Sequence, residues 1–404
     1  MISKQDVLER AHEWNLRPEV VEKDYVLGWV LAATTHLPAI GDHWVLKGGT
    51  CVKKCFFETY RFSEDLDFTL LPTAGYTEVQ IAESLRTLAR RTEEISGIRF
   101  HPGHFTVKPR RDKFGRMTFE GRLGYQGPLA RSTWPRILFD ITQHEPVLTT
   151  TVRRGVLHPY PDTLPPDTGI VTYSFEELLA EKTRALYERT RPRDLYDVVY
   201  ILDNLTKPLD RTLVKRVFEQ KCTFKAFTPP TANGIIARVK NAEELRADWN
   251  DMLAHQLPYI APIDGAIQRL GPALAWLTVE EPGALVATSA ERPMAPITTS
   301  SDQIIAPAQC RGGITELLRF AGSNRLLLSF DYSGKPRLVE PYSLRWAKST
   351  GHLNLYAWEI ASGQIKGFTT EKMSNVEIVQ QTFTPRFKIE LGTPDTISHG
   401  VWRP

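Results

Sequence analysis

A proline-rich stretch without helical or strand periodicity divides this chain of 404 residues into two unequal parts. Between Val279 and Gln309, four prolines alternate with Ala, Ser and Thr, a composition that is typical of a linker. We therefore expect a first domain over residues 1–277, a linker over 278–309 and a second domain over 310–404. Because the linker is long, we also expect the second domain to fold separately from the first.

The composition is that of a soluble globular protein. Hydrophobic residues make up 42% and charged residues 24%, which excludes wholesale disorder, collagen and coiled coil. The net charge of +3 neither demands nor excludes nucleic acid. The four cysteines, of which only Cys51 and Cys55 are close, form no framework of disulfides or zinc ligands. There is no signal-peptide core and no run of about 18 apolar residues, so we expect a cytoplasmic protein without a membrane partner.

Periodicity predicts an α+β fold. The N-terminus has helical apolar spacing, and residues 44–50 predict a strand that turns through glycines into a helix. Residues 66–70 predict a strand, and residues 98–142 alternate like antiparallel strands. Helical spacing returns over residues 174–204 and 241–277. After the linker, one short helix and about five strands predict a small β-barrel.

Two short strings have the residue types that phosphoryl transfer needs. Lys47-Gly48-Gly49-Thr50 predicts a turn at a helix N-terminus, where free backbone N–H groups favour a triphosphate and Thr50 adds a hydroxyl. Asp65 and Asp67 stand at i and i+2, so on a strand their carboxylates point the same way and can share Mg²⁺. Each string alone is more often a plain turn or a solvated strand face.

A third carboxylate comes from the strand predicted around residue 140. Ile137, Phe139 and Ile141 define one face of it, and Asp140 lies on the other. If this strand neighbours the one with Asp65 and Asp67, Asp140 lies beside the pair.

The helix that begins after Ser174 places a lysine in its apolar stripe. At 100° per residue, Lys182 falls between Leu178 and Leu186, and a lysine that faces inward needs a negative partner. Its stem can simply lie against the core with a solvated ammonium, or its charge can have a function. Asp194 and Asp197 open the next helix, where helix capping accounts for one of them.

Taken together, Leu46-Lys47-Gly48-Gly49-Thr50 and Arg61-Phe62-Ser63-Glu64-Asp65-Leu66-Asp67-Phe68 resemble the AbiEii/AbiGii toxin family of type IV toxin–antitoxin systems, which includes the MenT toxins. Val21-Glu22-Lys23-Asp24-Tyr25 and the segment from Glu177 through Lys182 to Arg193-Asp194-Leu195-Tyr196-Asp197 also match that family, over roughly residues 1–275. The resemblance implies a polymerase-β-like nucleotidyltransferase core with helical additions.

The resemblance also implies an activity and residue roles. A metal-dependent enzyme would transfer a nucleoside monophosphate from an NTP to an acceptor, the 3′ end of tRNA, as a toxin or phage-defence effector with a cognate antitoxin. Asp65, Asp67 and Asp140 would bind Mg²⁺ or Mn²⁺, with Asp140 alternatively acting as base. The string Lys47-Gly48-Gly49-Thr50 would bind the nucleotide, Lys182 would hold a phosphate and Asp194 would orient Lys182.

Basic residues cluster near these strings. Between Lys108 and Arg136, eight Lys and Arg face only two acids, Asp112 and Glu120, with aromatic residues interleaved. Such a hairpin can hold a single-stranded RNA end, and it can equally be a solvated face.

Residues 314–383 resemble a second family, the WYL domain, a small Sm-like β-barrel. The matching strings are Leu327 to Leu344, Leu353 to Trp358 and Phe368 to Val376, although Leu355-Tyr356-Ala357 stands where the family has Trp-Tyr-Leu. The resemblance implies a ligand pocket with Arg337, Tyr356 and Lys372. Ordinary barrel residues explain these three equally well.

Two other functions fit the sequence. The acceptor of the transferase can be a protein or a small molecule. Alternatively, the chain is a ligand-sensing nucleic-acid-binding regulator with a degenerate transferase core, although the intact set of carboxylates argues against degeneracy.

Overall fold

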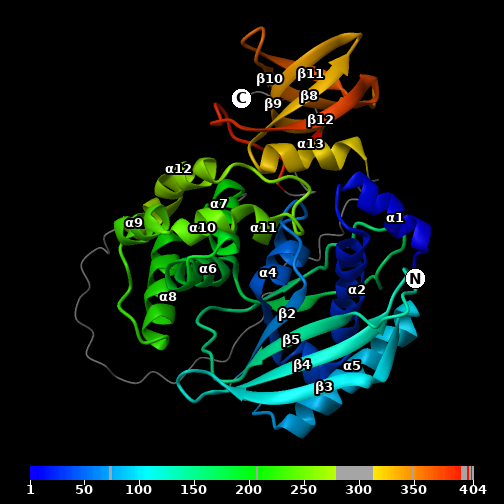
Figure 1. The fold of residues 1–404 in the computed structure, drawn as a ribbon, viewed down its shortest axis with the longest axis vertical. Coiled ribbons are helices and arrows are strands. Elements are labelled where there is room, and N and C mark those ends of the chain that lie inside the picture. The colour runs from blue at the N-terminus through cyan, green and yellow to red at the C-terminus, as the bar shows by residue number, and fades with distance from the viewer. Residues whose placement is uncertain are drawn as a thin grey trace.

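The structure is a computed structural model, which describes residues 1–71, 75–205, 208–278, 313–347, 350–392, 398–399 and 402. Of the expected linker, all residues but Thr278 lie outside these ranges. A large α+β part contains both chain segments with the predicted transferase strings, and a smaller sheet lies at one end of it (Figure 1). No helix in the described ranges is long and apolar enough to cross a membrane.

The α-helices are α1 (Lys4–Glu13), α2 (Pro18–Thr34), α3 (Pro38–Gly41), α4 (Gly48–Cys51), α5 (Glu78–Ser96), α6 (Phe175–Arg189), α7 (Pro192–Asp203), α8 (Arg211–Phe224), α9 (Ala232–Asn241), α10 (Glu243–Ala247), α11 (Trp249–Leu253), α12 (Ile263–Ala273) and α13 (Ile314–Ser323). The strands are β1 (Trp44–Lys47), β2 (Asp65–Leu70), β3 (Arg99–Arg111), β4 (Met117–Gln126), β5 (Arg136–Thr142), β6 (Val152–Arg154), β7 (Ile170–Thr172), β8 (Leu326–Tyr332), β9 (Lys335–Trp346), β10 (Leu353–Glu359), β11 (Gln364–Thr369), β12 (Met373–Thr382) and β13 (Ser398–His399).

Helix ends follow local chemistry. Ser3 caps α1 and Thr77 caps α5, each in a capping box with the residue three positions on. Gly97 ends α5 in the left-handed region, with a φ of 76°. A π-helical turn, η1 (Val52–Phe56), follows α4 directly, so the predicted helix after the glycine turn is one short continuous element.

The first sheet has seven strands in the order β3-β4-β5-β2-β1-β7-β6. β2 and β5 are parallel, as are β1 and β7, and the other pairs are antiparallel. Apolar side chains on one face, among them Phe68 of β2 and Phe139 of β5, are buried in a core with α2 and α5. Residues at the alternate positions therefore lie on the opposite face, where helix α4 and the helices from α6 onward stand.

The second sheet has the order β11-β10-β9-β8-β12, and β13 pairs with β9. Its five long strands are antiparallel. Among the described residues, β11 and β12 do not pair with each other, so the sheet is open and the expected closed barrel is not formed. The resemblance to the WYL domain stays a prediction.

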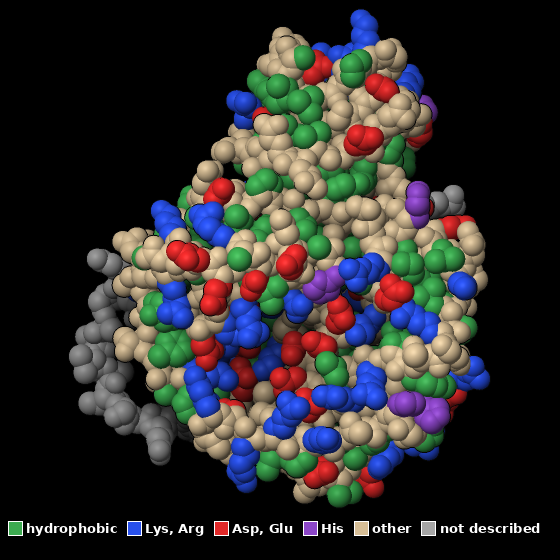
Figure 2. All heavy atoms as spheres, in the orientation of Figure 1, with side chains coloured by type: hydrophobic (Ala, Val, Ile, Leu, Met, Phe, Trp, Pro, Cys, Tyr) green, Lys and Arg blue, Asp and Glu red, His purple; other side chains and the backbone are tan. Residues whose placement is uncertain are grey.

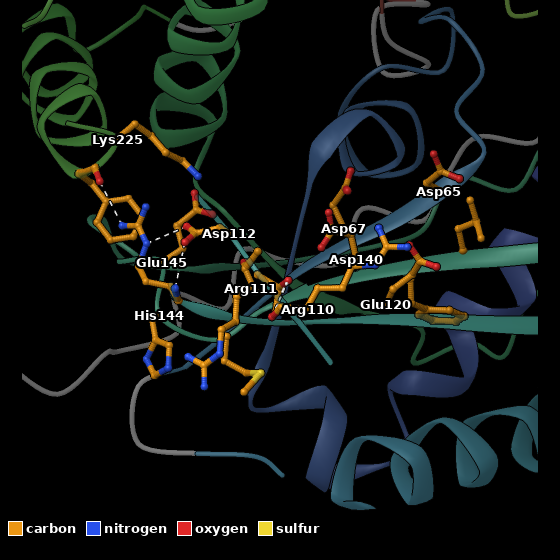
Figure 3. Close-up of a pocket in the computed structure, with 17 residues that line it drawn as sticks. Asp65, Asp67, Arg110, Arg111, Asp112, Glu120, Asp140, His144, Glu145 and Lys225 are labelled. Carbon is orange, nitrogen blue, oxygen red and sulfur yellow. Dashed lines mark hydrogen bonds and ion pairs between the residues drawn. The ribbon is translucent and has the colours of Figure 1, made fainter. Parts of the chain in front are cut away.

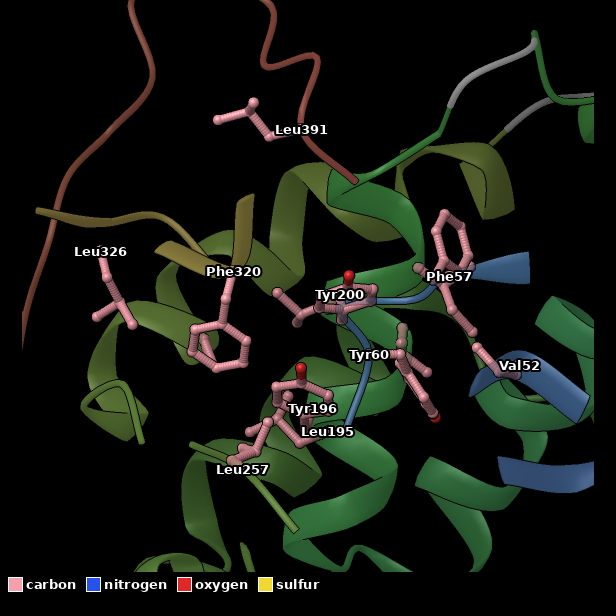
Figure 4. Packing of buried hydrophobic residues seen from close by; sticks show 14 of the residues in the cluster. Val52, Phe57, Tyr60, Leu195, Tyr196, Tyr200, Leu257, Phe320, Leu326 and Leu391 are labelled. Carbon is pink, nitrogen blue, oxygen red and sulfur yellow. The ribbon is translucent and has the colours of Figure 1, made fainter. Parts of the chain in front are cut away.

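The smaller part is not separate from the larger one. A single hydrophobic core runs from α6 to α12 into α13 and the second sheet, and Figure 4 shows Tyr196 and Tyr200 of α7 close to Phe320 of α13. Cutting the chain at the linker would expose part of this shared core to water, which favours the alternative that the C-terminal part docks on the core. Whether the second domain folds on its own stays a prediction.

Candidate active site

A row of charged residues crosses the open face of the first sheet. Lys47 of β1 is the register partner of Asp67 of β2, and Asp67 is the partner of Asp140 of β5. Asp140 in turn is opposite Glu120 of β4, which is opposite Lys108 of β3. The predicted strand neighbours are thus real neighbours, and two of the three predicted metal ligands are directly side by side.

Asp65 lies two residues before Asp67 on the same face of β2. The hydroxyls of Thr69 and Thr142, further along β2 and β5, are 3.2 Å apart, which shows that the two strands present these alternate positions to one side. Among the described residues, no hydrogen bond or ion pair reaches the carboxylates of Asp65, Asp67 or Asp140. In contrast, Glu120 is paired with Arg110 at 2.5 Å and with Arg122 at 2.7 Å.

Each of the three unpaired carboxyls has a raised pKa. Burial raises the pKa of Asp67 to about 6, with Lys47 opposing the shift and Asp140 adding to it. Loss of hydration raises the pKa of Asp65 first, and Glu64 and Asp140 contribute. The pKa of Asp140 rises from loss of hydration in the groove and from the charges of Glu145 and Glu120, although this side chain stays exposed at the rim. The raised values indicate crowded anions that a cation would stabilise.

The glycine turn lies directly against these carboxylates. Gly48 has a φ of 76°, and a Cβ built on it would be 1.8 Å from Oδ2 of Asp67. A Cβ on Gly49 would lie 2.8 Å from the hydroxyl of Ser63. Thr50 is buried and its hydroxyl donates to the carbonyl oxygen of Asp65. Thr50 therefore fixes the start of β2 rather than presenting its hydroxyl to the groove.

Lys47 lies in a buried network beneath the groove. Its Nζ is 2.6 Å from Oε2 of Glu145 and donates to the hydroxyl of Thr142 at 3.1 Å. Lys221 of α8 pairs with the other oxygen of Glu145 at 3.3 Å and with Glu177 at 2.9 Å. Burial opposes the charge of Glu145, but Lys47 and Lys221 outweigh it and hold its pKa well below the usual range. Lys47 therefore links β1 to helix α8 through Glu145 and Lys221, and its ammonium group does not point into the groove.

Lys182 has the negative partner that its position requires, and the partner is Asp197. Nζ of Lys182 donates to Oδ2 of Asp197 at 2.7 Å. Nε and Nη2 of Arg61 also donate to the two oxygens of Asp197, at 2.6 and 2.9 Å. Burial would raise the pKa of Asp197, but the charges of Arg61 and Lys182 hold it well below its usual range.

The predicted role of Asp194 needs correction. Its carboxylate is 2.5 Å from Arg189, within hydrogen-bond distance, and it does not contact Lys182. Arg191 is the cap residue of α7 and makes no side-chain cap bond, so helix capping explains neither aspartate. Asp194 and Asp197 lie on the same side of α7, about one helical turn apart. Only Asp197 is close enough to Lys182 to accept its hydrogen bond.

A groove of about 440 Å³ opens along the three carboxylates (Figures 2 and 3). Its lining combines acidic and basic side chains: Asp65, Asp67, Asp140, Glu120, Glu145, Arg110, Arg111, Arg116, His144 and Lys225. In Figure 3, Asp67 and Asp140 lie next to each other, with Glu120 on one side of them and Glu145 and Lys225 on the other. The basic hairpin expected from the sequence thus forms one wall of the groove.

The three residues of the expected WYL pocket do not meet. Arg337 is 2.5 Å from Glu359, which is buried, whereas Tyr356 is on the other face of β10 in an aromatic cluster with Tyr342 and Trp402. Lys372 is exposed in a short 3-10 helix. Alternation along a strand separates Tyr356 from Glu359, so Arg337 and Tyr356 cannot line one pocket.

A comparison with known families agrees with the site. A family model described as the nucleotidyl transferase AbiEii toxin of type IV toxin–antitoxin systems matches residues 29–277, more than half of the chain. The chain belongs to this family. It is a nucleotidyltransferase, as the resemblance of its strings predicts, and AbiEii membership brings with it an NTP substrate and an antitoxin partner.

Among solved structures, the AbiEii chain described here is similar to MenT4, the nucleotidyltransferase toxin Rv2826c from Mycobacterium tuberculosis H37Rv. The TM-score is 0.45 and the identity 20%, over 70% of this chain and 91% of that chain. No curated protein matches the sequence.

Sequence reasoning missed three residues that organise this AbiEii site. Arg61 belongs to the string that carries the family resemblance. Its position, four residues before Asp65, was the one sequence feature that pointed to a role in the site. Asp197 was considered only as a helix cap. Glu145 precedes a proline in a loop, and nothing in the local pattern indicates that it meets Lys47.

Proposed function

We propose that this AbiEii protein transfers a nucleoside monophosphate from an NTP to an RNA 3′ end in a divalent-metal-dependent reaction. The observation that carries the proposal is the set of unpaired carboxylates, Asp65, Asp67 and Asp140, next to the Gly48 turn. Oxygen donors are the ligands that Mg²⁺ and Mn²⁺ prefer. In the described residues no three His, Cys, Asp or Glu side chains converge into a metal cluster. Ion binding would draw these three together.

The bound metal would supply positive charge against the phosphate oxygens. Gly48 and Gly49 let Asp67 and Ser63 pack directly against the backbone of the turn, where a side chain on either glycine would collide with them. The backbone N–H groups of this turn would bind phosphate oxygens. Lys182 is oriented by Asp197 and would neutralise charge on the departing pyrophosphate. Asp140, at the exposed rim, would be the third ligand of the ion or, alternatively, the base that accepts the proton of the attacking hydroxyl.

The basic wall of the groove favours RNA as the acceptor. Arg111 is exposed, lines the groove and donates only to the carbonyl oxygen of Gly115 among the described residues, so its remaining donors are available for a phosphate. Phe224 also lines the groove, where the guanidinium of Arg116 lies 3.7 Å from the centre of its ring, and a base would stack on the ring's other face or replace Arg116. The tRNA 3′ end is the acceptor that fits a single-stranded terminus, and its modification would arrest growth or limit phage infection.

The test is incubation of the protein with each α-labelled NTP, Mg²⁺ and total RNA, followed by gel separation. We expect label in tRNA-sized RNA, and none after the 3′ hydroxyls are destroyed by periodate. Label that persists on periodate-treated RNA, or appears on protein instead, would contradict the proposed acceptor. Addition of a chelator should abolish labelling, and labelling in its presence would contradict the role of the metal.

A further inference from the structure

One short segment connects helix α13 to the candidate active site. Residues 58–65, here called the 58–65 segment, begin below α13 and end at Asp65. Nη1 of Arg319 in α13 is 2.6 Å from Oε2 of Glu58. The hydroxyl of Thr59 is 3.0 Å from that of Ser323 and 2.6 Å from that of Tyr200. The first residues of the segment are thus held by the C-terminal part of the chain.

The same segment then supplies three groups to the site. Arg61 makes the two-pronged contact with Asp197, which orients Lys182. Ser63 lies against Gly49 at the glycine turn, and Asp65 is a proposed metal ligand. Glu58, at the start of the segment, is three residues from Arg61 and seven from Asp65. A displacement of Glu58 would therefore also move these two residues.

Helix α13 also contacts α7, the helix that carries Asp197, the partner of Arg61. Tyr196, next to Asp197 in α7, donates its hydroxyl to Oδ1 of Asn324 at the end of α13, at 2.9 Å. Both sides of the Arg61–Asp197 pair are consequently tied to one helix that belongs to the C-terminal part. The ring centroids of Tyr60 and Tyr196 are 5.8 Å apart, and Figure 4 shows Tyr196 between Tyr60 and Phe320 in this view.

We propose that Arg319 is a positioning residue for nucleotidyl transfer, acting through Glu58 on Arg61 and Asp65. The side chain of Arg319 is fully buried, at 0% exposure, and that of Glu58 is 10% exposed. A largely buried charge pair of this kind is a costly way to dock one domain on another, but it fixes geometry because the fully buried Arg319 cannot turn to water. The proposal rests on the proposed transferase function.

The chain offers a matched control in the same helix. Glu316 of α13 pairs with Arg10 of α1 at 3.4 Å and accepts from Nε1 of Trp14. Helix α1 carries no residue of the candidate site, and neither hydrogen-bond partner of Glu316 belongs to the 58–65 segment. Trp14 does pack on Phe62 of that segment, and the charge of Glu316 also acts on Glu58 and Arg319. Because Gln keeps the shape of Glu, Glu316→Gln leaves this packing in place. Arg319→Met and Glu58→Gln break the proposed link, whereas Glu316→Gln weakens the control contact.

The experiment measures kcat and the KM for NTP in full-length variants, together with hydrogen exchange of residues 57–65. We expect Arg319→Met and Glu58→Gln to lower kcat at least tenfold with little change in KM, and to speed exchange in the segment. Arg319→Lys should recover part of kcat, and Glu316→Gln should retain it. Equal losses in Arg319→Met and Glu316→Gln, or an unchanged exchange rate in the segment, would overturn the proposal.

The exchange measurement separates this proposal from the transferase function on which it rests. If the wild-type protein transfers no nucleotide to any RNA, the proposed function fails, and the exchange rates still decide whether Arg319 controls the segment. If Arg319→Met does not fold, Glu58→Gln, which removes a charge from a partly exposed group, gives the same comparison.

Discussion

Gly48 lies so close to Asp67 that a Cβ atom on the glycine would be 1.8 Å from Oδ2 of the aspartate. No side chain fits there unless β2 or the turn moves, and β2 carries both Asp65 and Asp67. The glycine turn therefore sets how closely helix α4 approaches the carboxylates.

Gly48→Ala should consequently lower nucleotide transfer by about a hundredfold, since an ångström-scale displacement of reacting groups costs that much. Gly97→Ala is the control: Gly97 has the same φ of 76°, but nothing lies within 4 Å of its would-be Cβ. Both variants should lose about 1–2 kcal/mol of stability from the left-handed backbone. If Gly97→Ala loses transfer to the same degree, backbone strain rather than the contact with Asp67 is responsible.

Asp67→Asn should abolish transfer and stabilise the metal-free protein above pH 6. The pKa of Asp67 is raised to about 6, so the folded state favours the protonated carboxyl. That stabilisation is fully present below the unfolded pKa of about 3.9 and is lost as pH rises through 6. Thermal melting of wild type and Asp67→Asn should give equal Tm values near pH 4 and a higher Tm for the variant at pH 8. Its free energy of unfolding at pH 8 should be larger by about 1–3 kcal/mol. A lower Tm for the variant at pH 8 would contradict the claim that the ionised carboxylate of Asp67 destabilises the metal-free protein.

Lys182→Met should remove transfer while leaving stability nearly unchanged. Asp197 keeps its two-pronged contact with Arg61 in this variant, so no buried charge loses its only partner. The expected loss of kcat is about 10²–10³-fold, as for other groups that stabilise developing charge. Unfolding in urea and single-turnover kinetics together separate this outcome from a structural role, for which stability would fall and transfer would persist.

Asp197→Asn should instead destabilise the protein by about 3–5 kcal/mol, because two buried cations then lack their common partner. The matched control is Asp194→Asn, whose partner Arg189 has a side chain that is 49% exposed and can turn to water. Denaturant unfolding at pH 7 should therefore show a clearly smaller loss for Asp194→Asn. Equal losses in the free energy of unfolding would mean that the Arg61–Asp197–Lys182 cluster stabilises the protein no more than the Arg189–Asp194 pair does.

Arg111→Ala should weaken RNA binding and reduce the slope of log affinity against log salt by about 1, as expected for one lost phosphate contact. Arg99→Ala removes an exposed arginine from the far end of the same strand, outside the groove, and should leave the slope unchanged. Fluorescence anisotropy with labelled tRNA over a salt series measures both. Identical slopes for the two variants would place the RNA elsewhere.

The face of the sheet that carries the three carboxylates could be predicted from the sequence because strand alternation is local. The period of two puts Asp65 and Asp67 on one side and separates Asp140 from Phe139, and only the pairing of β2 with β5 had to be assumed. The AbiEii strings pointed to the same residues. In contrast, the choice between Asp194 and Asp197 depends on where α7 crosses α6, which no local pattern contains.

The docking of the C-terminal part could not be predicted for a related reason. A proline-rich stretch suggests independent domains, yet Arg319 and Phe320 of α13 contribute to a buried interface with residues more than a hundred positions away. Contacts of that kind depend on the tertiary arrangement of two hydrophobic surfaces, each of which looks like an ordinary core in the sequence. The buried pair of Lys47 and Glu145 is a second example, since a loop residue completes it.

The most direct test of the central claim compares pyrophosphate release with nucleotide incorporation into RNA, in the wild-type protein and in Asp67→Asn, with Mg²⁺ at pH 7.5. The account predicts one pyrophosphate for each nucleotide added to a 3′ end by the wild type, and neither product from the variant. Release of inorganic phosphate without incorporation, or undiminished incorporation by Asp67→Asn, would contradict it.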